Sequence, residues 1–333
     1  NGSKRLNTIK QEKLNNQAAN LDVETSENSI QESIAQIYIQ ILYAAESVKV
    51  NENTLQVSIA QRDRGQELLN AGSIAKSDLA QLEAQVSTDR YQLVTAQATL
   101  QDYKLQLKQL LELDGENEMN VYLPALSDEN VLLPLPTKKD VYMSALTLRP
   151  EIEASKLSVE ASELGIDIAK AGYLPTISLS AGIGTNHTSG SDFTFGEQVK
   201  NGWNNSIGVS VSVPIFNNRQ TKSAVQKAKL QRETSLLSLL DEQKTLYKTI
   251  EGLWLDANSA QQRYAAANEK LRSTQISYDL ISEQFNLGMK NTVELLTEKN
   301  NLLQAQQEQL QAKYMAILNT QLLKFYQGDK LAL

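Results

Sequence analysis

Side chains that could carry out catalysis or bind a metal are scarce in this 333-residue chain, which contains one His and no Cys. The lack of Cys excludes thiol catalysis, disulfides and cysteine metal sites, and a single His excludes a cluster of histidine ligands. His187 lies in a polar segment rich in Gly, Asn and Ser, where a solvated loop histidine is a simpler interpretation than a ligand. No pair of acids converges, so we expect neither an enzyme nor a bound cofactor or metal.

Two acids nevertheless stand at matching places in the chain. Asp78 and Glu294 each follow a glycine, Gly72 and Gly288, by six residues. An acid in the first turns of a helix interacts favourably with the helix dipole, and this is the plain structural interpretation. Whether the two acids do more depends on the elements that position them.

The composition favours elongated helices over a compact enzyme. The formal net charge is -7, which gives no reason to expect a nucleic-acid partner. All six prolines lie between Pro124 and Pro214, and glycine is rare on either side of the middle, so both flanks can hold long helices. No run of 18 or more apolar residues occurs, and no transmembrane helix is therefore expected.

The C-terminal flank carries a heptad stripe that is typical of coiled-coil-like packing. A helix over 219–286 would be roughly 100 Å long at about 1.5 Å per residue. Asn286-Leu287-Gly288 predicts a tight turn, and a second helix returns over 290–327. The stripe consists of Leu236, Leu239, Gln243, Leu246, Ile250, Leu253, Ala257, Ala260, Tyr264, Ala267, Leu271, Thr274, Tyr278, Ile281 and Phe285.

The N-terminal flank repeats this plan. A shift of 216 residues without gaps aligns Asn1 with Asn217, Asn70-Ala71-Gly72 with Asn286-Leu287-Gly288, and Asp78 with Glu294. We interpret 1–115 and 217–333 as one helical hairpin used twice, with tips near 70–76 and 286–290. Two unrelated hairpins with coinciding turns are the alternative. The first stripe consists of Ile30, Ile34, Ile37, Ile41, Ala44, Val48 and Leu55.

The middle of the chain predicts a different architecture. A linker over 116–136 and a short helix near 138–147 make up 116–150, and a helix over 151–172 precedes two alternating strands, about 176–184 and 205–213. Strands of this length can cross a bilayer when tilted, and a soluble sheet would show the same alternation. One hairpin cannot close a barrel, so a membrane sheet needs further strands. The apolar face consists of Ile177, Leu179, Ile183, Ile207, Val209, Val211 and Val213.

Four motifs, in this order and spacing, resemble the TolC-type outer-membrane efflux protein family. They are Leu148-Arg149-Pro150-Glu151-Ile152, Tyr173-Leu174-Pro175-Thr176-Ile177-Ser178-Leu179, Val209-Ser210-Val211-Ser212-Val213-Pro214-Ile215-Phe216-Asn217, and Phe285-Asn286-Leu287-Gly288 with Val293-Glu294-Leu295-Leu296. Together with the duplication, the resemblance covers essentially the whole chain.

The resemblance implies a mainly α protein with very long duplicated antiparallel helical hairpins and transmembrane β-barrel strands. In this family a homotrimer forms a β-barrel in the Gram-negative outer membrane and an α-barrel tunnel through the periplasm. Such proteins are passive ducts of tripartite efflux pumps or type I secretion systems and catalyse no reaction. They dock onto a periplasmic adaptor (membrane fusion protein), which links them to an inner-membrane transporter of the RND, ABC or MFS type.

The resemblance also implies roles for residues near the two tips. Glu294 and Asp78 match the acids of the pore constriction, where three copies would form a carboxylate ring. Ser77, Phe285 and Lys290 match gate residues that join neighbouring tips; Phe285 lacks the hydroxyl that the family's Tyr supplies, and Lys290 lacks the fork of an Arg. The tip turns, which would also contact the adaptor, are formed by Gly72, Gly288, Asn70 and Asn286.

The sequence departs from the family pattern at its start, where repeat one lacks a counterpart of about 116–216. We expect about 100 further residues and a signal sequence before Asn1, including a helix and two strands, on the length of the repeat. A soluble structural or signalling coiled-coil protein with a small β module is the alternative function.

Overall fold

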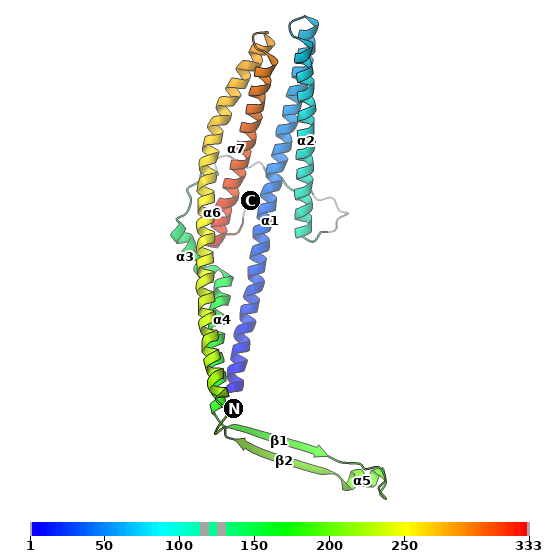
Figure 1. The fold of residues 1–333 in the computed structure, drawn as a ribbon, viewed down its shortest axis with the longest axis vertical. Coiled ribbons are helices and arrows are strands. Elements are labelled where there is room, and N and C mark those ends of the chain that lie inside the picture. Colours follow the sequence, from blue (N-terminus) through cyan, green and yellow to red (C-terminus); the bar gives the residue numbers. More distant parts are fainter. Residues whose placement is uncertain (1, 114–119, 125–130, 332–333) are drawn as a thin grey trace. The chain divides into compact units, whose positions relative to one another are not determined.

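The computed structural model describes residues 2–113, 120–124 and 131–331, and is built mainly from helices (Figure 1). The chain divides into two compact units. Unit 1 contains the residues up to Glu24 together with Pro150–Gln243, and unit 2 contains Thr25–Arg149 and the residues from Lys244 onward. The elements are α1 (Lys4–Asn70), α2 (Lys76–Leu110), α3 (Lys138–Leu148), α4 (Pro150–Lys170), the 3-10 turn η2 (Ala171–Tyr173), β1 (Thr176–Gly184), α5 (Phe195–Asn201), β2 (Asn204–Ser212), α6 (Gln220–Asn286) and α7 (Thr292–Gln327).

The two helical hairpins, α1/α2 and α6/α7, have the same element boundaries after a shift of 216 residues. This spacing separates the starts of the long helices, their ends and the starts of the return helices: Lys4 and Gln220, Asn70 and Asn286, Lys76 and Thr292. α1 and α6 both have 67 residues. The predicted pairing of Asn1 with Asn217 lies outside the described residues, as do 116–119 and 125–130 of the predicted linker.

The heptad stripe predicts the packed face of α6 correctly. Every residue of the stripe is buried or half-buried, and Ile250, Ala257 and Tyr264 are at most 2% exposed. Leucines off the stripe, such as Leu237 and Leu255, are more than half exposed. The 3.5-residue period therefore marks the one seam that this helix packs, and the remaining faces stay polar or exposed.

A large apolar cluster lies in unit 2 and joins α1 to α6 and α7. Ala35, Ile39 and Leu42 of α1 pack with Ala260 and Tyr264 of α6 and with residues of α7 from Ala312 to Leu322. Ile30 of the predicted stripe differs, being 47% exposed, because it precedes the part of α1 that enters this cluster.

Arg149, the middle of the Leu-Arg-Pro motif, ties the end of α3 into unit 2. Its guanidinium pairs with Glu32 of α1 at 2.7 Å and lies over the rings of Phe325 and Tyr326, 4.9 and 3.7 Å from their centroids. Arg149 is only 6% exposed, so its charge is compensated by both a carboxylate and two aromatic faces. Pro150 then begins α4, a position that proline favours.

Unit 1 packs α4 against the first part of α1 and the first part of α6. Gln11 donates to the carbonyl of Ala161 at 2.8 Å, and Arg232 pairs with Glu163 at 2.9 Å. β1 and β2 extend from this unit as one antiparallel pair, with Ile177 opposite Val211. The observed strands agree with the predicted ones to within one residue. The predicted polar loop between them differs, because Phe195–Asn201 forms a short helix capped by Thr194 and Glu197.

Candidate functional site

The candidate site lies at the tips of the two hairpins in unit 2, where both hairpins turn through the same backbone geometry. Gly72 has a φ of 75° and Gly288 a φ of 71°, which is the left-handed region that glycine adopts without strain. The N–H of Gly72 donates to Leu69 O at 2.9 Å, and the N–H of Gly288 donates to Phe285 O at 2.9 Å. Both turns directly follow an asparagine, Asn70 or Asn286, that ends the long helix.

Asp78 and Glu294 both occupy the first turn of a return helix and cap it. A carboxylate oxygen of Asp78 accepts from the N–H of Ala75 at 3.0 Å. Glu294 accepts from the N–H of Asn291 at 3.3 Å, while the Asn291 side chain accepts from the N–H of Glu294 at 2.9 Å. The contact with the N-cap residue is reciprocal at Glu294 and one-way at Asp78, because Ala75 has no side-chain acceptor. These contacts and the helix dipole account for an acid at each position within one chain.

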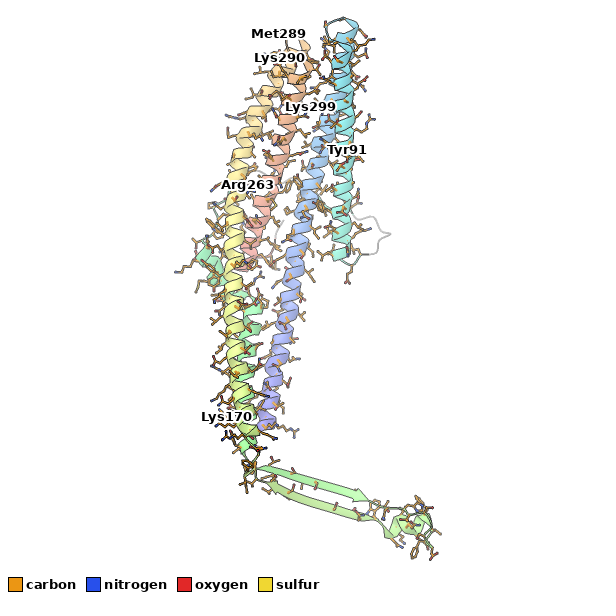
Figure 2. All side chains as sticks on the ribbon, viewed as in Figure 1. Tyr91, Lys170, Arg263, Met289, Lys290 and Lys299 are labelled. Carbon is orange, nitrogen blue, oxygen red and sulfur yellow. The ribbon has the colours of Figure 1, made fainter. Side chains whose placement is uncertain are left out.

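Lys290 holds Glu294 in a second way. The Lys290 ammonium lies 2.6 Å from the Glu294 carboxylate, and both side chains are about one-third to two-fifths exposed, at 34% and 40%. The Lys290 ammonium, followed by the Asn291 N–H, holds the pKa of the Glu294 carboxyl below its ordinary value. Glu294 is therefore ionised and partly neutralised by a neighbour on its own hairpin (Figure 2 labels Lys290 and Met289 at this tip).

The predicted gate residues are not brought together within one chain. Lys290 contacts Glu294 of its own hairpin, and Asp78 caps its own helix. Ser77 is exposed at the start of α2. Phe285 is only 2% exposed and packs in an apolar cluster with Leu68, Leu82 and Leu295. The aromatic ring thus fills the core beneath both tips.

Other residues join the two hairpins near their tips, and the sequence reasoning missed them. Arg64 of α1 donates to the carbonyl of Asn286 at 3.2 Å, and Gln61 donates to the hydroxyl of Tyr278 at 2.8 Å. Gln61 follows the buried Thr54 by seven residues, one heptad, and is itself only 9% exposed. Thr54, Ser58 and Gln61 follow one another at spacings of four and three residues, which places Gln61 on the seam of α1, but nothing local distinguishes it from the other polar residues of this helix.

The β-hairpin presents a continuous apolar face. Leu179 lies opposite Val209, and on the other face Ser178 lies opposite Ser210. All seven apolar residues predicted for this face are exposed by 60% or more. A large exposed apolar patch on a folded protein is typical of a surface that binds lipid or another protein.

The helices of the described residues include none that is both long and apolar enough to cross a membrane. Within residues 2–113, 120–124 and 131–331, no group of three or more His, Asp or Glu side chains is arranged to hold a metal ion.

Comparison with known families identifies the family to which the chain belongs. The family model described as "Outer membrane efflux protein" matches residues 141–328, which is more than half of the chain. The chain belongs to the outer membrane efflux protein family. This membership favours the duct hypothesis over the soluble coiled-coil alternative.

Individual relatives support this family membership. The chain is 25% identical over 294 residues to the outer membrane efflux protein BepC of Brucella suis biovar 1 (strain 1330), covering 88% of this chain and 61% of that protein. It is 25% identical over 311 residues to the outer membrane protein TolC of Escherichia coli (strain K12), covering 89% and 60%. The chain thus spans about three fifths of the length of these curated relatives.

Solved structures show the same fold. The channel-forming protein CusC superposes with a TM-score of 0.85 at 19% identity, covering 99% of this chain and 75% of that one. The CmeC outer membrane channel of Campylobacter jejuni superposes with a TM-score of 0.80 at 20% identity, covering 99% and 69%. The mainly helical fold with a two-stranded sheet is therefore that of outer-membrane efflux channels.

Proposed function

We propose that this chain forms, as a homotrimer in the outer membrane of a Gram-negative bacterium, a passive duct of a tripartite efflux or type I secretion system. Its partners are a periplasmic adaptor (membrane fusion protein) and, through it, an inner-membrane transporter of the RND, ABC or MFS type. Relatives named as outer membrane efflux proteins support the duct, and the relative AprF, an alkaline protease secretion protein of Pseudomonas aeruginosa, supports the secretion class.

The observation that carries this proposal is the exposed apolar face of the β-hairpin. Val209 and Leu179 are 70% and 75% exposed and lie opposite each other, while the other face consists of serines and glycines with Thr176 and Asn204 at its ends. Water would hydrate such a face unfavourably, whereas lipid would cover it. The small polar face then points to a water-filled lumen, and further strands close the barrel in the assembled channel.

Both helical hairpins contribute to the tunnel in this proposal. α1 with α2, within 1–115, and α6 with α7, within 217–333, are two copies of one unit, connected by the segment 116–150 and by 151–216. Each long helix packs one seam and leaves its other faces polar or exposed. Helices of this kind suit a tube with a watery interior, in which neighbouring copies cover the remaining apolar positions.

The tips form the entrance of the duct. Glu294 from three copies, together with Asp78, lines a constriction that favours cations and repels anions. Ser77, Phe285 and Lys290 contribute to the gate, with Phe285 acting through the core beneath it. The turns at Gly72 and Gly288, with Asn70 and Asn286, contact the adaptor. Exposed Leu287 and Met289, 69% and 71% accessible, add an apolar contact at the second tip.

Planar-bilayer recording tests the duct and its constriction together. We expect the protein to conduct ions, and Glu294→Ala to lower cation selectivity and to weaken block by multivalent cations, because it removes the ring of charge. Glu112→Ala is the matched control, since Glu112 lies just beyond α2 at the end opposite the tip. Absence of channels in the unaltered protein contradicts the duct. Unchanged selectivity and block in Glu294→Ala contradict the constriction alone.

A further inference from the structure

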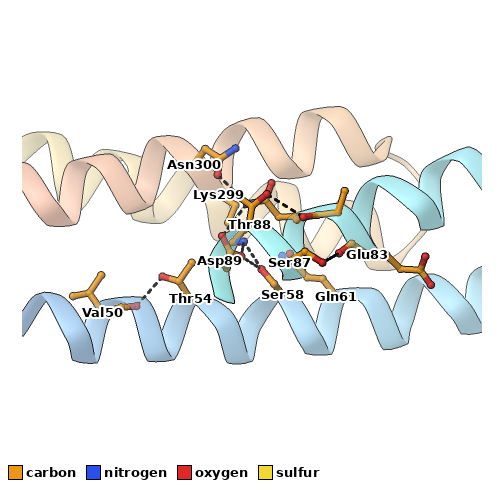
Figure 3. A network of polar contacts seen from close by, with 12 residues as sticks. Val50, Thr54, Ser58, Gln61, Glu83, Ser87, Thr88, Asp89, Lys299 and Asn300 are labelled. Carbon is orange, nitrogen blue, oxygen red and sulfur yellow. Dashed lines mark hydrogen bonds and ion pairs between the residues drawn. The ribbon is translucent and has the colours of Figure 1, made fainter. Parts of the chain in front are cut away.

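Three polar side chains from three helices meet in the interior of unit 2. The Lys299 ammonium of α7 contacts both the Asp89 carboxylate of α2 and the Ser58 hydroxyl of α1, and Ser58 also donates to Asp89 (Figure 3). Lys299, Asp89 and Ser58 are only 3%, 1% and 2% exposed. We call these three residues the buried triad.

Each member of the triad occupies a position of a packing seam at which the helical spacing would otherwise place an apolar residue. Lys299 stands four residues after buried Leu295 and three before buried Leu302. Asp89 follows buried Val86 by three residues, and Ser58 follows buried Leu55 by three. The triad therefore occupies the positions at which helices meet, and it is no part of a solvated face.

Each polar side chain of the triad has partners within the triad, and Asp89 has one further partner outside it. One Asp89 oxygen accepts from Lys299 and Ser58, and the other accepts from Gln85 at 2.9 Å. Gln85 also reaches the side-chain oxygen of Asn300 on α7 at 3.5 Å. Burial lowers the pKa of the Lys299 ammonium, and the Asp89 carboxylate opposes this effect.

A buried ion pair is a poor source of stability, because removing two charges from water offsets most of their attraction. Apolar side chains of similar size would pack these seams as well or better. A polar residue in a coiled-coil seam instead selects one alignment, since any slip of a helix leaves the polar group buried without its partner. Sliding α7 by one turn would separate Lys299 from Asp89 in this way.

We propose that the buried triad fixes the alignment of α7 against α1 and α2 and thereby positions Asp78 and Glu294 relative to each other. Glu294 precedes Lys299 by five residues on α7, and Asp78 precedes Asp89 by eleven on α2. The triad thus joins the two helices that carry the candidate constriction acids. The alignment is a property of one chain, and only its consequence for the constriction rests on the proposed function.

Spin-label distance measurements test the alignment directly, because the chain has no Cys that would interfere. Labels are attached to Lys76→Cys at the start of α2 and Met289→Cys at the second tip, both exposed, in the full protein diluted with unlabelled copies. The informative variant is the pair Lys299→Met with Asp89→Leu, which removes both charges and keeps the seam filled. Lys270→Met is the control, because Lys270 forms an exposed interhelical pair with Glu308 at 2.7 Å.

We expect one narrow distance in the unaltered protein and in Lys270→Met. The double variant should unfold at an equal or higher urea concentration, yet show a broader distribution or a second distance displaced by about 5 Å, one helical turn. Lys299→Arg, which keeps the charge, should retain the narrow distance. A double variant with the original narrow distance overturns the proposal, as does one whose distances broaden only because it has lost stability.

Bilayer recordings of the same double variant separate this proposal from the proposed function. If the unaltered protein conducts, the double variant should show conductance that varies from channel to channel. If the unaltered protein forms no channels while the distances change as expected, the duct is wrong and the alignment role of the triad stands.

Discussion

A charged substitution should impair membrane insertion on one face of the β-hairpin and be tolerated on the other. Val209→Arg places a guanidinium on the apolar face, beside Leu179, and Ser210→Arg places the same group on the face shared with Ser178. Both positions are exposed neighbours on one strand, so neither substitution disturbs a packed core. If the apolar face meets lipid, only Val209→Arg should impair insertion.

The magnitude follows from the position of Val209 along β2. The strand runs over nine residues, Asn204–Ser212, and Val209 is the sixth, close to the middle. An arginine that faces lipid costs about 2–4 kcal/mol at the bilayer midplane and about 0–1 kcal/mol near the interfaces. The lower midplane cost already reduces the ratio of inserted to uninserted protein roughly thirtyfold. Val213→Arg, just beyond the strand, should therefore cost less than Val209→Arg.

Insertion can be measured by urea titration of the protein refolded into lipid vesicles. Trp203 borders β2, and once Trp254 is replaced by Phe it is the only tryptophan and reports on the hairpin. We expect the inserted fraction to fall in the order Ser210→Arg, Val213→Arg, Val209→Arg. Equal insertion of the Ser210 and Val209 variants would refute the lipid-facing assignment and favour a soluble sheet.

Two further predictions concern stability in unit 2. Phe285→Ala should lower the free energy of unfolding by about 3–5 kcal/mol, because it leaves a cavity beneath both tips. Met289 is exposed, so Met289→Ala should change the free energy of unfolding by less than about 0.5 kcal/mol. Circular dichroism during urea unfolding measures both variants, and similar midpoints would contradict the packing role of Phe285. Burial, with the nearby Glu32 charge, raises the pKa of Tyr326 to about 12. The resulting contribution to the stability of the folded state, of order 2 kcal/mol, is fully present below the ordinary tyrosine pKa near 10 and is lost as the pH rises through 12. Tyr326→Phe should remove that loss from a plot of stability against alkaline pH, and an unchanged plot would count against this role of Tyr326.

The sequence predicts the helices, the tips and the strands because each depends on local pattern. The stripe from Leu236 to Phe285 needs only its spacing to identify the packed face of α6, and every member is buried or half-buried. The tip glycines adopt positive φ values that their position after the long helices requires. The alternation over 176–184 marks one apolar face, and β1 has those bounds.

The contacts between helices are less predictable, because they depend on which residues of distant segments meet. Lys299 and Asp89 are 210 residues apart, and Arg64 and Asn286 are 222 apart. A lysine and an aspartate on long polar helices resemble ordinary surface charges until the packing shows that both lie in seams. The apolar stripe found for the first repeat ends at Leu55, although the seam continues through Ser58 and Gln61 as polar residues.

The seam of α1 therefore has a polar stretch, at Ser58 and Gln61, between two apolar parts. Around Ala35, Ile39 and Leu42 the seam is apolar, so it tolerates small displacements and is held by the loss of water from its surface. Between this part and the apolar cluster of Leu68 and Phe285, the seam positions are Ser58 and Gln61, and their contacts are directional hydrogen bonds and one buried ion pair. Directional contacts add little net stability, but they are satisfied in one geometry and leave unpaired polar groups in others. Along α1, apolar clusters on both sides of these polar contacts supply the cohesion, and the polar contacts between them select one alignment of the helices. That alignment matters most near the tips, because the proposed constriction depends on the positions of Asp78 and Glu294.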